Sequence, residues 1–200
     1  MSAASDPLIP EELRTALAGE RIGKEIVVLA ETASTNDVAW EAERGGAQAG
    51  LVVFAEHQTK GRGQYGRQWE SAPYLGLWFS VLLRPAMTLA ESPRLTSVLA
   101  EVLAATIAET TGLTPKIKPP NDIFIDDRKV AGILVEGRTS AEGAYVAVAG
   151  IGINVNQAPG DFPELLRETA CSLALVTGRK IDRTKLAIAL LRNLNGDALL

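Results

Sequence analysis

Apolar residues gather along the chain in short runs that predict β-strands. Such runs cover residues 25–30, 51–55 and 77–83, each bounded by glycine, proline or polar residues. The run 77–83 lacks a clean alternation of apolar and polar residues, which indicates a strand buried on both faces. A short strand is expected at 116–118, then one hairpin with arms at 123–125 and 130–135 and a second hairpin with arms at 144–149 and 150–156.

Helical spacing of apolar positions predicts the helices. The clearest begins at Ser92 and runs to about residue 111, where Gly112 stops it. Another follows the polar segment 32–37 and runs through Trp40 to about residue 44. Its N-cap is Ser34 or Thr35, and Asp37 lies near the capping-box position. Further helices are expected at residues 10–18, 162–167, 172–176 and 183–200.

Strands outnumber helices in these predictions, and hairpins are adjacent along the chain. Hairpins make antiparallel pairs, whereas a doubly wound parallel sheet requires a helix between successive strands. We therefore expect an α+β fold, with a mixed, largely antiparallel β-sheet and helices packed on it.

Composition narrows the class of protein. Two hundred residues suffice for one domain with its own core. A net charge of −4 gives the whole chain no attraction to nucleic acid or to an anionic membrane, so neither is expected as a partner. The single cysteine, Cys171, has no partner for an internal disulfide, which favours a cytoplasmic location. We find no signal-peptide pattern and no apolar run near the ~18 residues of a membrane span.

A glycine-rich segment at residues 58–71 carries the first candidate chemistry. Three glycines alternate with Arg62 and Arg67 directly after an apolar run. Glycine lets backbone N–H groups approach a ligand closely, and arginine forks suit carboxylate or phosphate. The string Gly-x-Gly-x-x-Gly occurs here, but it lies between two strands and opens no helix, which argues against a dinucleotide site. The segment therefore predicts a site for an anion.

Three further polar clusters end or interrupt apolar runs: residues 34–36, residues 118–122 with Lys129, and Asn154 with Asn156. Polar groups are costly to bury without partners, so four such places suggest one shared cavity. The expected ligand has an anionic centre and amide-like hydrogen-bonding ends. Alone, each residue has a simpler interpretation, such as a helix cap, a turn or a core aromatic. We interpret His57 as a packing residue at a strand end.

Five motifs in order resemble those of the biotin protein ligases, a family related to lipoate ligases. The resemblance covers the chain from about Ile26 onward. The matching residues are Ser34-Thr35-Asn36; Gln58, Gly61, Arg62, Gly63, Gly66, Arg67 and Trp69; Lys118, Pro120, Asn121 and Asp122; Lys129, Gly132, Ile133, Leu134 and Glu136; and residues 150–156.

The resemblance implies a two-step reaction that uses ATP and Mg²⁺. Biotin would react with ATP to give biotinyl-5′-AMP and pyrophosphate, and a lysine of a biotin carboxyl carrier protein, a subunit of acetyl-CoA carboxylase, would then displace AMP. Arg62 and Lys129 would be the catalytic residues, and Asp122 would hold the metal. Biotin would contact Ser34, Thr35, Asn36, Gln58, Gly61, Arg62, Gln64, Lys129 and Gly132, and the nucleotide would contact Arg62, Gly63, Arg67, Trp69, Asn121 and Asn154.

The chain departs from the family pattern in several places. Gln64 stands where the family has arginine, which predicts a weaker hold on the adenylate phosphate, and Pro119 replaces a tryptophan. By this resemblance we expect residues 1–24 to be an extension with a short helix and without a DNA-binding domain, and we expect no repressor function. Residues 25–200 are expected to be the catalytic domain, without the family's small C-terminal β-barrel.

Two alternatives stay open. A lipoate or octanoate ligase would share the fold, and a non-catalytic module would bind biotin without using ATP. A homodimer formed through a sheet edge is also possible for such a fold.

Overall fold

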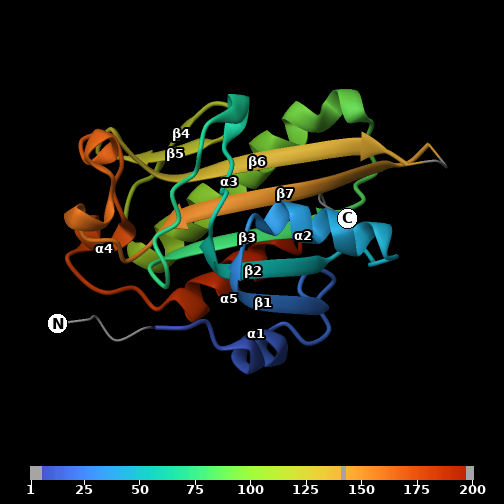
Figure 1. The fold of residues 1–200 in the computed structure, drawn as a ribbon, viewed down its shortest axis with the longest axis horizontal. Helices are drawn as coiled ribbons and strands as arrows, with labels where there is room; N and C mark the ends of the chain where they lie inside the picture. The colour runs from blue at the N-terminus through green and yellow to red at the C-terminus, as the bar shows by residue number, and fades with distance from the viewer. Residues whose placement is uncertain (1–5, 141–142, 197–200) are drawn as a thin grey trace.

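The computed structural model describes residues 6–140 and 143–196, and a seven-stranded sheet forms its centre (Figure 1). The strands are ordered β1-β2-β3-β7-β6-β5-β4. Only β1 and β2 pair in parallel among the neighbours of this sheet, so the expected mixed, largely antiparallel sheet is confirmed. Their bounds are β1 (Glu25–Thr32), β2 (Leu51–Gln58), β3 (Gly76–Leu83), β4 (Lys116–Lys118), β5 (Asp122–Ile125), β6 (Arg128–Thr139) and β7 (Tyr145–Asn154).

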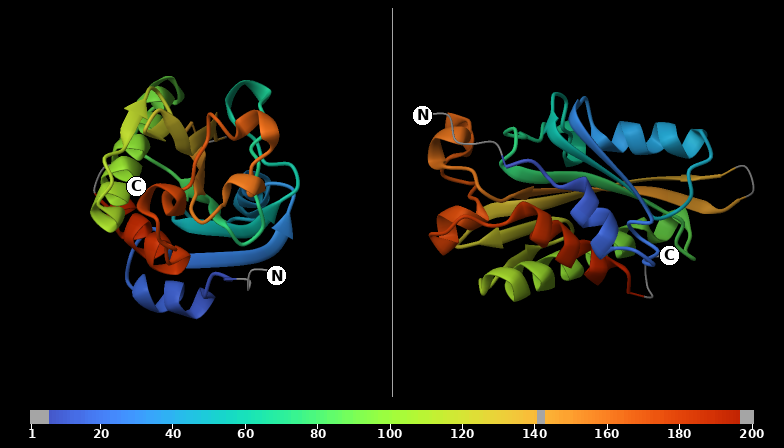
Figure 2. Two further views of the ribbon diagram at one scale, coloured as in Figure 1. Left: turned by 90° about the vertical axis from the view of Figure 1, so that its left-hand side faces the viewer. Right: turned by 90° about the horizontal axis from the view of Figure 1, so that it is seen from below.

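Helices cover the two faces of the sheet unequally. In Figure 2, α3 and α5 pack together on one face, whereas α2 lies on the other, against β2, β3 and β7. No helix within the described ranges is both long and apolar enough to cross a membrane. The bounds are α1 (Pro10–Ala16), α2 (Thr35–Arg44), α3 (Ser92–Thr111), α4 (Leu173–Thr177) and α5 (Arg183–Leu194), with 3₁₀ turns η1 (Gln64–Gly66), η2 (Leu89–Glu91), η3 (Pro159–Asp161) and η4 (Glu164–Leu166).

Strand β2 explains why both faces of the sheet are apolar. Val52 and Phe54 enter the larger core with α3 and α5, whereas Leu51 and Val53 join a smaller cluster under α2. Successive side chains of a strand point to opposite faces, so a continuous apolar run results. The same explanation holds for β3, all eight residues of which are buried, as its sequence predicted.

Three predictions of secondary structure were wrong. Residues 144–149 and 150–156 do not form a hairpin: β7 is one strand that passes straight through Gly150 and pairs with β6. The last helix ends at Leu194, where the Asn195 side chain hydrogen-bonds to the main chain of Ile22, and residues 197–200 lie outside the described range. The expected helix at 162–167 is replaced by the single 3₁₀ turn η4, and η3 precedes that range.

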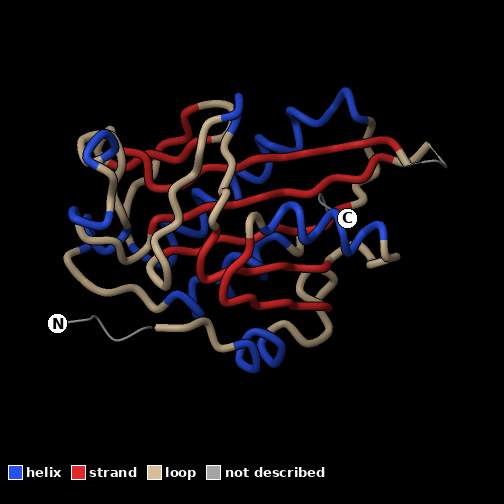
Figure 3. The backbone as a smooth tube through the Cα atoms, in the orientation of Figure 1, coloured by secondary structure: helices blue, strands red, loops and turns tan. Residues whose placement is uncertain are grey.

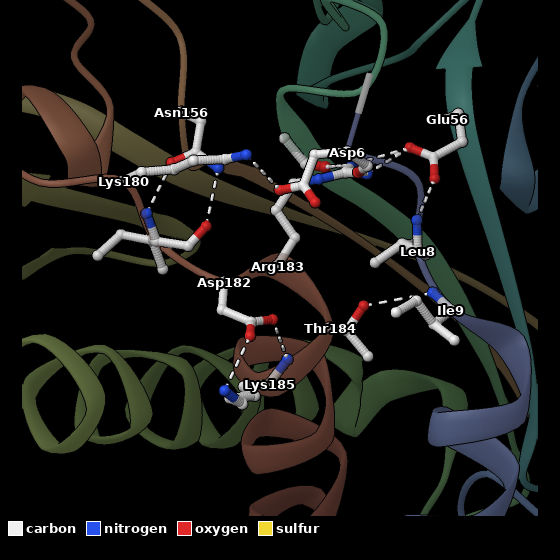
Figure 4. Close-up of polar contacts among 12 residues, drawn as sticks. Asp6, Leu8, Ile9, Glu56, Asn156, Lys180, Asp182, Arg183, Thr184 and Lys185 are labelled. Atoms are coloured by element: carbon white, nitrogen blue, oxygen red, sulfur yellow. Dashed lines mark hydrogen bonds and ion pairs between the residues drawn. The ribbon is translucent and has the colours of Figure 1, made fainter. Parts of the chain in front are cut away.

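A buried ion pair joins the N-terminal segment and α5 to the sheet (Figure 4). Both terminal nitrogens of Arg183 lie 2.7–2.8 Å from Glu56 Oε2, and the two side chains are 1% and 4% exposed. Arg183 also donates to the carbonyls of Gly76 and Asp6, and Leu8 N donates to Glu56 Oε1. One guanidinium thus holds together four segments that are far apart in the sequence.

Candidate functional site

The glycine-rich segment lies over the face of the sheet that carries α2. Residues 59–75 leave β2, cross in front of β7 and β6, and return to β3, as the loops of Figure 3 show. Trp69 N donates to Gly61 O at 2.9 Å, and Gly63 N donates to Arg67 O at 2.7 Å. A side chain at Gly61 would meet the Trp69 carbonyl at 2.4 Å, so only glycine lets the two limbs of the loop cross this closely.

The floor beneath the loop is made of glycines on the two central long strands. A Cβ at Gly150 would lie 2.4 Å from Asn36 Oδ1, and a Cβ at Gly152 would lie 2.6 Å from the Trp69 ring. A Cβ at Gly132 would lie 3.0 Å from the same ring. These positions on β6 and β7 are therefore bare because other side chains occupy the space above them.

Hydroxyl and amide groups at the start of α2 line a small cavity of about 50 Å³. Gln58 Oε1 accepts hydrogen bonds from Thr35 N at 2.8 Å and from Thr35 Oγ1 at 3.1 Å. Ser80 Oγ lies 2.6 Å from Asn36 Oδ1. Asn36 Nδ2 is buried and has no hydrogen-bond partner among the described residues. A ligand with a carbonyl acceptor would satisfy this donor.

Trp69 separates this cavity from a larger one and lines both. Its ring meets Trp78 edge to face, with the ring centroids 6.1 Å apart. Lys129 Nζ lies 5.2 Å from the ring centroid, within the range of a cation–π contact. The tryptophan is therefore fixed by an aromatic side chain, a cation and the glycine floor.

The larger cavity measures about 670 Å³, a volume typical of small-molecule sites. One wall is the return limb of the glycine loop with Arg67, and another is the segment with Phe162 and Leu166. That second wall is tied to β6, because Lys129 N donates to Thr169 O at 2.8 Å. Asn154 faces this cavity and accepts a hydrogen bond from Gln157 Nε2 at 3.2 Å.

Lys129 lies between the two cavities and lines both. Its Nζ is 2.7 Å from Asp122 Oδ1, with side chains 30% and 24% exposed. A register shift between Ile123 and Phe124, where β5 pairs with β6, falls directly beside it. Such irregularities redirect side chains next to functional sites. The lysine is therefore half-buried, charge-paired and directed into the site instead of standing at an exposed hairpin tip.

Arg62 lies at the side of the small cavity, on the outer face of the loop. Its two terminal nitrogens lie 2.8 and 2.7 Å from the two carboxylate oxygens of Asp37, and Nη2 is 3.3 Å from Glu136 Oε1. Glu136 also accepts from Trp40 Nε1 at 3.0 Å. Hydrogen bonding to Arg62 lowers the pKa of Asp37, opposed in part by burial, and the same bond raises the pKa of Arg62.

The structure brings nearly all of the predicted site residues together, around two adjoining cavities instead of one. The small cavity is lined by Ser34, Thr35, Asn36, Gln58, Arg62 and Gly132, the large one by Arg67, Asp122 and Asn154, and both by Gly63, Gln64, Trp69, Asn121 and Lys129. Gly61 lines neither cavity; its missing side chain lets the loop pass close to the Trp69 carbonyl. Asn156 also lies apart, because its side chain bonds to the main chain of Ile181.

Sequence reasoning missed Ser80 and Asp37 as parts of the site. Ser80 is fully buried and joins Thr35 to Asn36. Its signal was the single hydroxyl in an otherwise apolar strand. Asp37 was considered only as a capping residue, and the structure gives no side-chain cap to α2.

Fold and site together define a class of protein: an α+β ligand-binding domain that can hold two small ligand groups side by side, with a lysine between them. A model of the Biotin/lipoate A/B protein ligase family matches residues 28–156 of the chain. Since this is more than half of its length, the chain belongs to that family.

Relatives of known function share much of the sequence. The chain is 39% identical over 176 residues to the bifunctional ligase/repressor BirA of Bacillus subtilis, which covers 88% of this chain and 54% of that protein. It is 34% identical to the biotin–[acetyl-CoA-carboxylase] ligase of Mycobacterium tuberculosis, over 94% of this chain and 70% of that protein. The chain thus spans about half the length of its BirA relatives.

Solved structures agree with the fold. The Aquifex aeolicus biotin protein ligase in complex with biotin and ATP superposes with a TM-score of 0.72 at 32% identity, covering 86% of this chain and 68% of that chain. The Leishmania major enzyme in complex with biotinyl-5-AMP gives 0.70 at 25% identity, covering 86% and 74%.

Proposed function

We propose that this protein joins biotin to a lysine of a biotin carboxyl carrier domain, in the cytoplasm, through biotinyl-5′-AMP. The single observation that carries the proposal is the pair of adjoining cavities with Lys129 on their common border. All residues expected to contact biotin except Gly61 line the small cavity, and most of those expected to contact the nucleotide line the large one. The names of the relatives, which include ligases of biotin and of acetyl-CoA carboxylase, support the same substrates.

The first step would join the two ligands at the border. The biotin carboxylate would attack the α-phosphate of ATP, forming a carboxyl–phosphate bond as pyrophosphate leaves. Two anions must approach each other, and at an effective dielectric near 20 two unit charges about 4 Å apart repel by about 4 kcal/mol. Lys129 would offset this repulsion, and Arg62 would bind the phosphate.

Positioning would supply the rest of the catalysis. The buried donor Asn36 Nδ2, together with Ser34 and Thr35, would orient the ring amide of biotin. In the second step the carrier lysine would attack the acyl carbon and release AMP, so no side chain of this protein need form a covalent bond.

A magnesium ion would enter with the ATP phosphates, since Mg²⁺ keeps several waters and takes one or two carboxylates. The large cavity offers the carboxylates of Glu70, Asp122, Asp127 and Asp161. Residues 6–140 and 143–196 contain no group of three or more acidic, histidine or cysteine side chains that could hold an ion alone. This donor set fits an ion carried by the nucleotide, which would supply charge neutralisation to the phosphates.

Pyrophosphate release by the full chain with biotin, ATP and Mg²⁺, followed by biotin labelling of a carrier domain, tests the proposal. Release that depends on biotin is expected, and the carrier lysine should be modified. Release with lipoate or octanoate in place of biotin would assign the chain to the related acyl ligases. Biotin binding without pyrophosphate release would make it a binding module.

A further inference from the structure

The Arg62 guanidinium is paired with carboxylates of its own chain. Its terminal nitrogens bind both oxygens of Asp37 in the two-pronged geometry that arginine also uses for phosphate. Glu136 approaches the same guanidinium at 3.3 Å. Two carboxylates therefore contact one guanidinium, and Arg44 acts on Asp37 only through space.

A phosphate that binds Arg62 competes with these carboxylates for the same guanidinium donors, and Arg44 offsets only part of the charge of Asp37. Glu136 is the better anchored of the two. Its second oxygen accepts from Trp40 Nε1, and its side chain is 30% exposed. The Asp37 carboxylate has no hydrogen-bond partner other than Arg62 in the described part of the chain, and its side chain is 54% exposed. Asp37 is the group that can leave.

The small size of the cavity is consistent with Arg62 held by Asp37 at its side. At about 50 Å³ the cavity has room for a few water molecules, far below the roughly 300 Å³ at which small-molecule sites begin. Arg62 and Asn36 both line it, and Arg62 binds Asp37, the residue after Asn36 in the first turn of α2. Release of Arg62 from Asp37 frees the loop from one of its contacts with α2.

We propose that Asp37 is an intramolecular competitor for the adenylate phosphate: it binds Arg62 in the resting protein and is displaced when biotinyl-5′-AMP binds. The proposal rests on the proposed function and adds a positioning residue to it. Its consequence is a weaker hold on the intermediate than Arg62 alone would give. Asp37 acts through Arg62 and does not touch the substrate.

The test is a titration of the full chain with biotinol-5′-AMP, a stable analogue that keeps the phosphate and replaces the acyl carbonyl by CH₂. Asp37→Asn removes the charge and keeps the shape. It is expected to bind the analogue about three- to fivefold more tightly, the factor that corresponds to a well-formed exposed ion pair. The gain should appear mainly as slower dissociation.

Three controls separate competition from a structural effect. Glu41→Gln removes one exposed charge from the same helix, in a side chain without a hydrogen bond to Arg62, and should bind like the unchanged chain. Asp37→Glu keeps the carboxylate and should bind within about twofold of the unchanged chain. Biotinamide, which lacks both phosphate and charge, should bind equally to the unchanged chain and to Asp37→Asn.

The outcomes separate the two proposals. If the unchanged chain does not bind the analogue, the ligase assignment and the competition both fail. If it binds, and Asp37→Asn binds equally or more weakly, only the competition fails. An equal gain for biotinamide also overturns it, since the substitution would then act on the shape of the cavity.

Discussion

Two arginine–carboxylate contacts in this protein use the same chemistry in opposite surroundings. Arg183 is 1% exposed and bound to Glu56 and to main-chain carbonyls, whereas Arg62 is 37% exposed and bound to Asp37 and Glu136. Removing one partner from a buried pair leaves a charge without water, which is strongly destabilising. An exposed pair contributes little to stability, because water replaces the lost partner. Burial therefore makes one contact structural and leaves the other free to exchange partners.

The sharpest challenge to this comparison is Arg183→Met. The substitution leaves Glu56 buried without its cation, and we expect the free energy of unfolding to fall by about 3–5 kcal/mol. Urea denaturation measures the loss. The double variant Glu56→Met with Arg183→Met removes both charges and should recover most of the stability. A loss below about 1 kcal/mol in the single variant would mean that water reaches this pair.

Gly152→Ala tests whether the glycine floor beneath the loop is needed to make room for the Trp69 ring. The new methyl group would lie 2.6 Å from the Trp69 ring, so the ring must move, at a cost of about 1–3 kcal/mol for an overpacked site. Thermal unfolding gives the cost, and tryptophan fluorescence reports the displaced ring. Gly160→Ala is the control, because its methyl group meets no atom within 4 Å. Equal effects of the two substitutions would contradict the role of Gly152 as clearance.

Arg62→Ala is expected to give the inverse of Arg183→Met. The free energy of unfolding should fall by less than about 1 kcal/mol, since the pair is exposed. Biotin-dependent pyrophosphate release should nevertheless fall by about 10² or more, the usual effect of removing one donor that binds developing charge. Arg179→Ala, at an exposed position away from both cavities, serves as the control for a lost positive charge. A large loss of stability with unchanged pyrophosphate release would mean that the Arg62 contact is structural, like that of Arg183.

The smallest expected effect is the acid titration of Asp37. Because Arg62 lowers the pKa of this carboxyl group, the pair contributes stability above the ordinary aspartate pKa of about 3.9 and loses it as pH falls through the lower folded value. Since Asp37 is half-exposed, solvent screening limits the stability that the pair contributes to roughly a few tenths of a kcal/mol. In Arg62→Ala, carboxyl ¹³C NMR should show that the titration midpoint of Asp37 rises toward about 3.9. Identical midpoints would indicate that the pair does not form in solution.

Much of this architecture was predictable because it follows from apolar periodicity. The buried strand at residues 77–83 and the helix from Ser92 to Thr111 were both expected, and both are present. The hairpin at Gly150 failed for a physical reason. Glycine in a sequence pattern signals a turn, but here it provides clearance for Asn36 above a continuous strand. A local pattern does not show what another segment places over a residue.

The candidate site was predictable as a set of residues but not as a geometry. Nearly every site residue that polar interruptions of apolar runs and the family motifs indicated lines a cavity, because buried polar groups need partners wherever they occur. The division into two cavities and the pairing of Asp37 with Arg62 depend on contacts across 25 residues of sequence, which no local rule contains. Asn156 shows the reverse error, since a polar residue at a strand end can be satisfied by a neighbouring main chain.

The Trp69 side chain lines both the small and the large cavity. Because one rigid indole borders both, a guest that pushes it changes the space available to the other guest. Thermodynamic linkage then requires reciprocity: whatever factor one guest imposes on the affinity of its neighbour, the neighbour returns. We expect the two occupants to bind cooperatively, with Trp69 as one of the side chains that couple them.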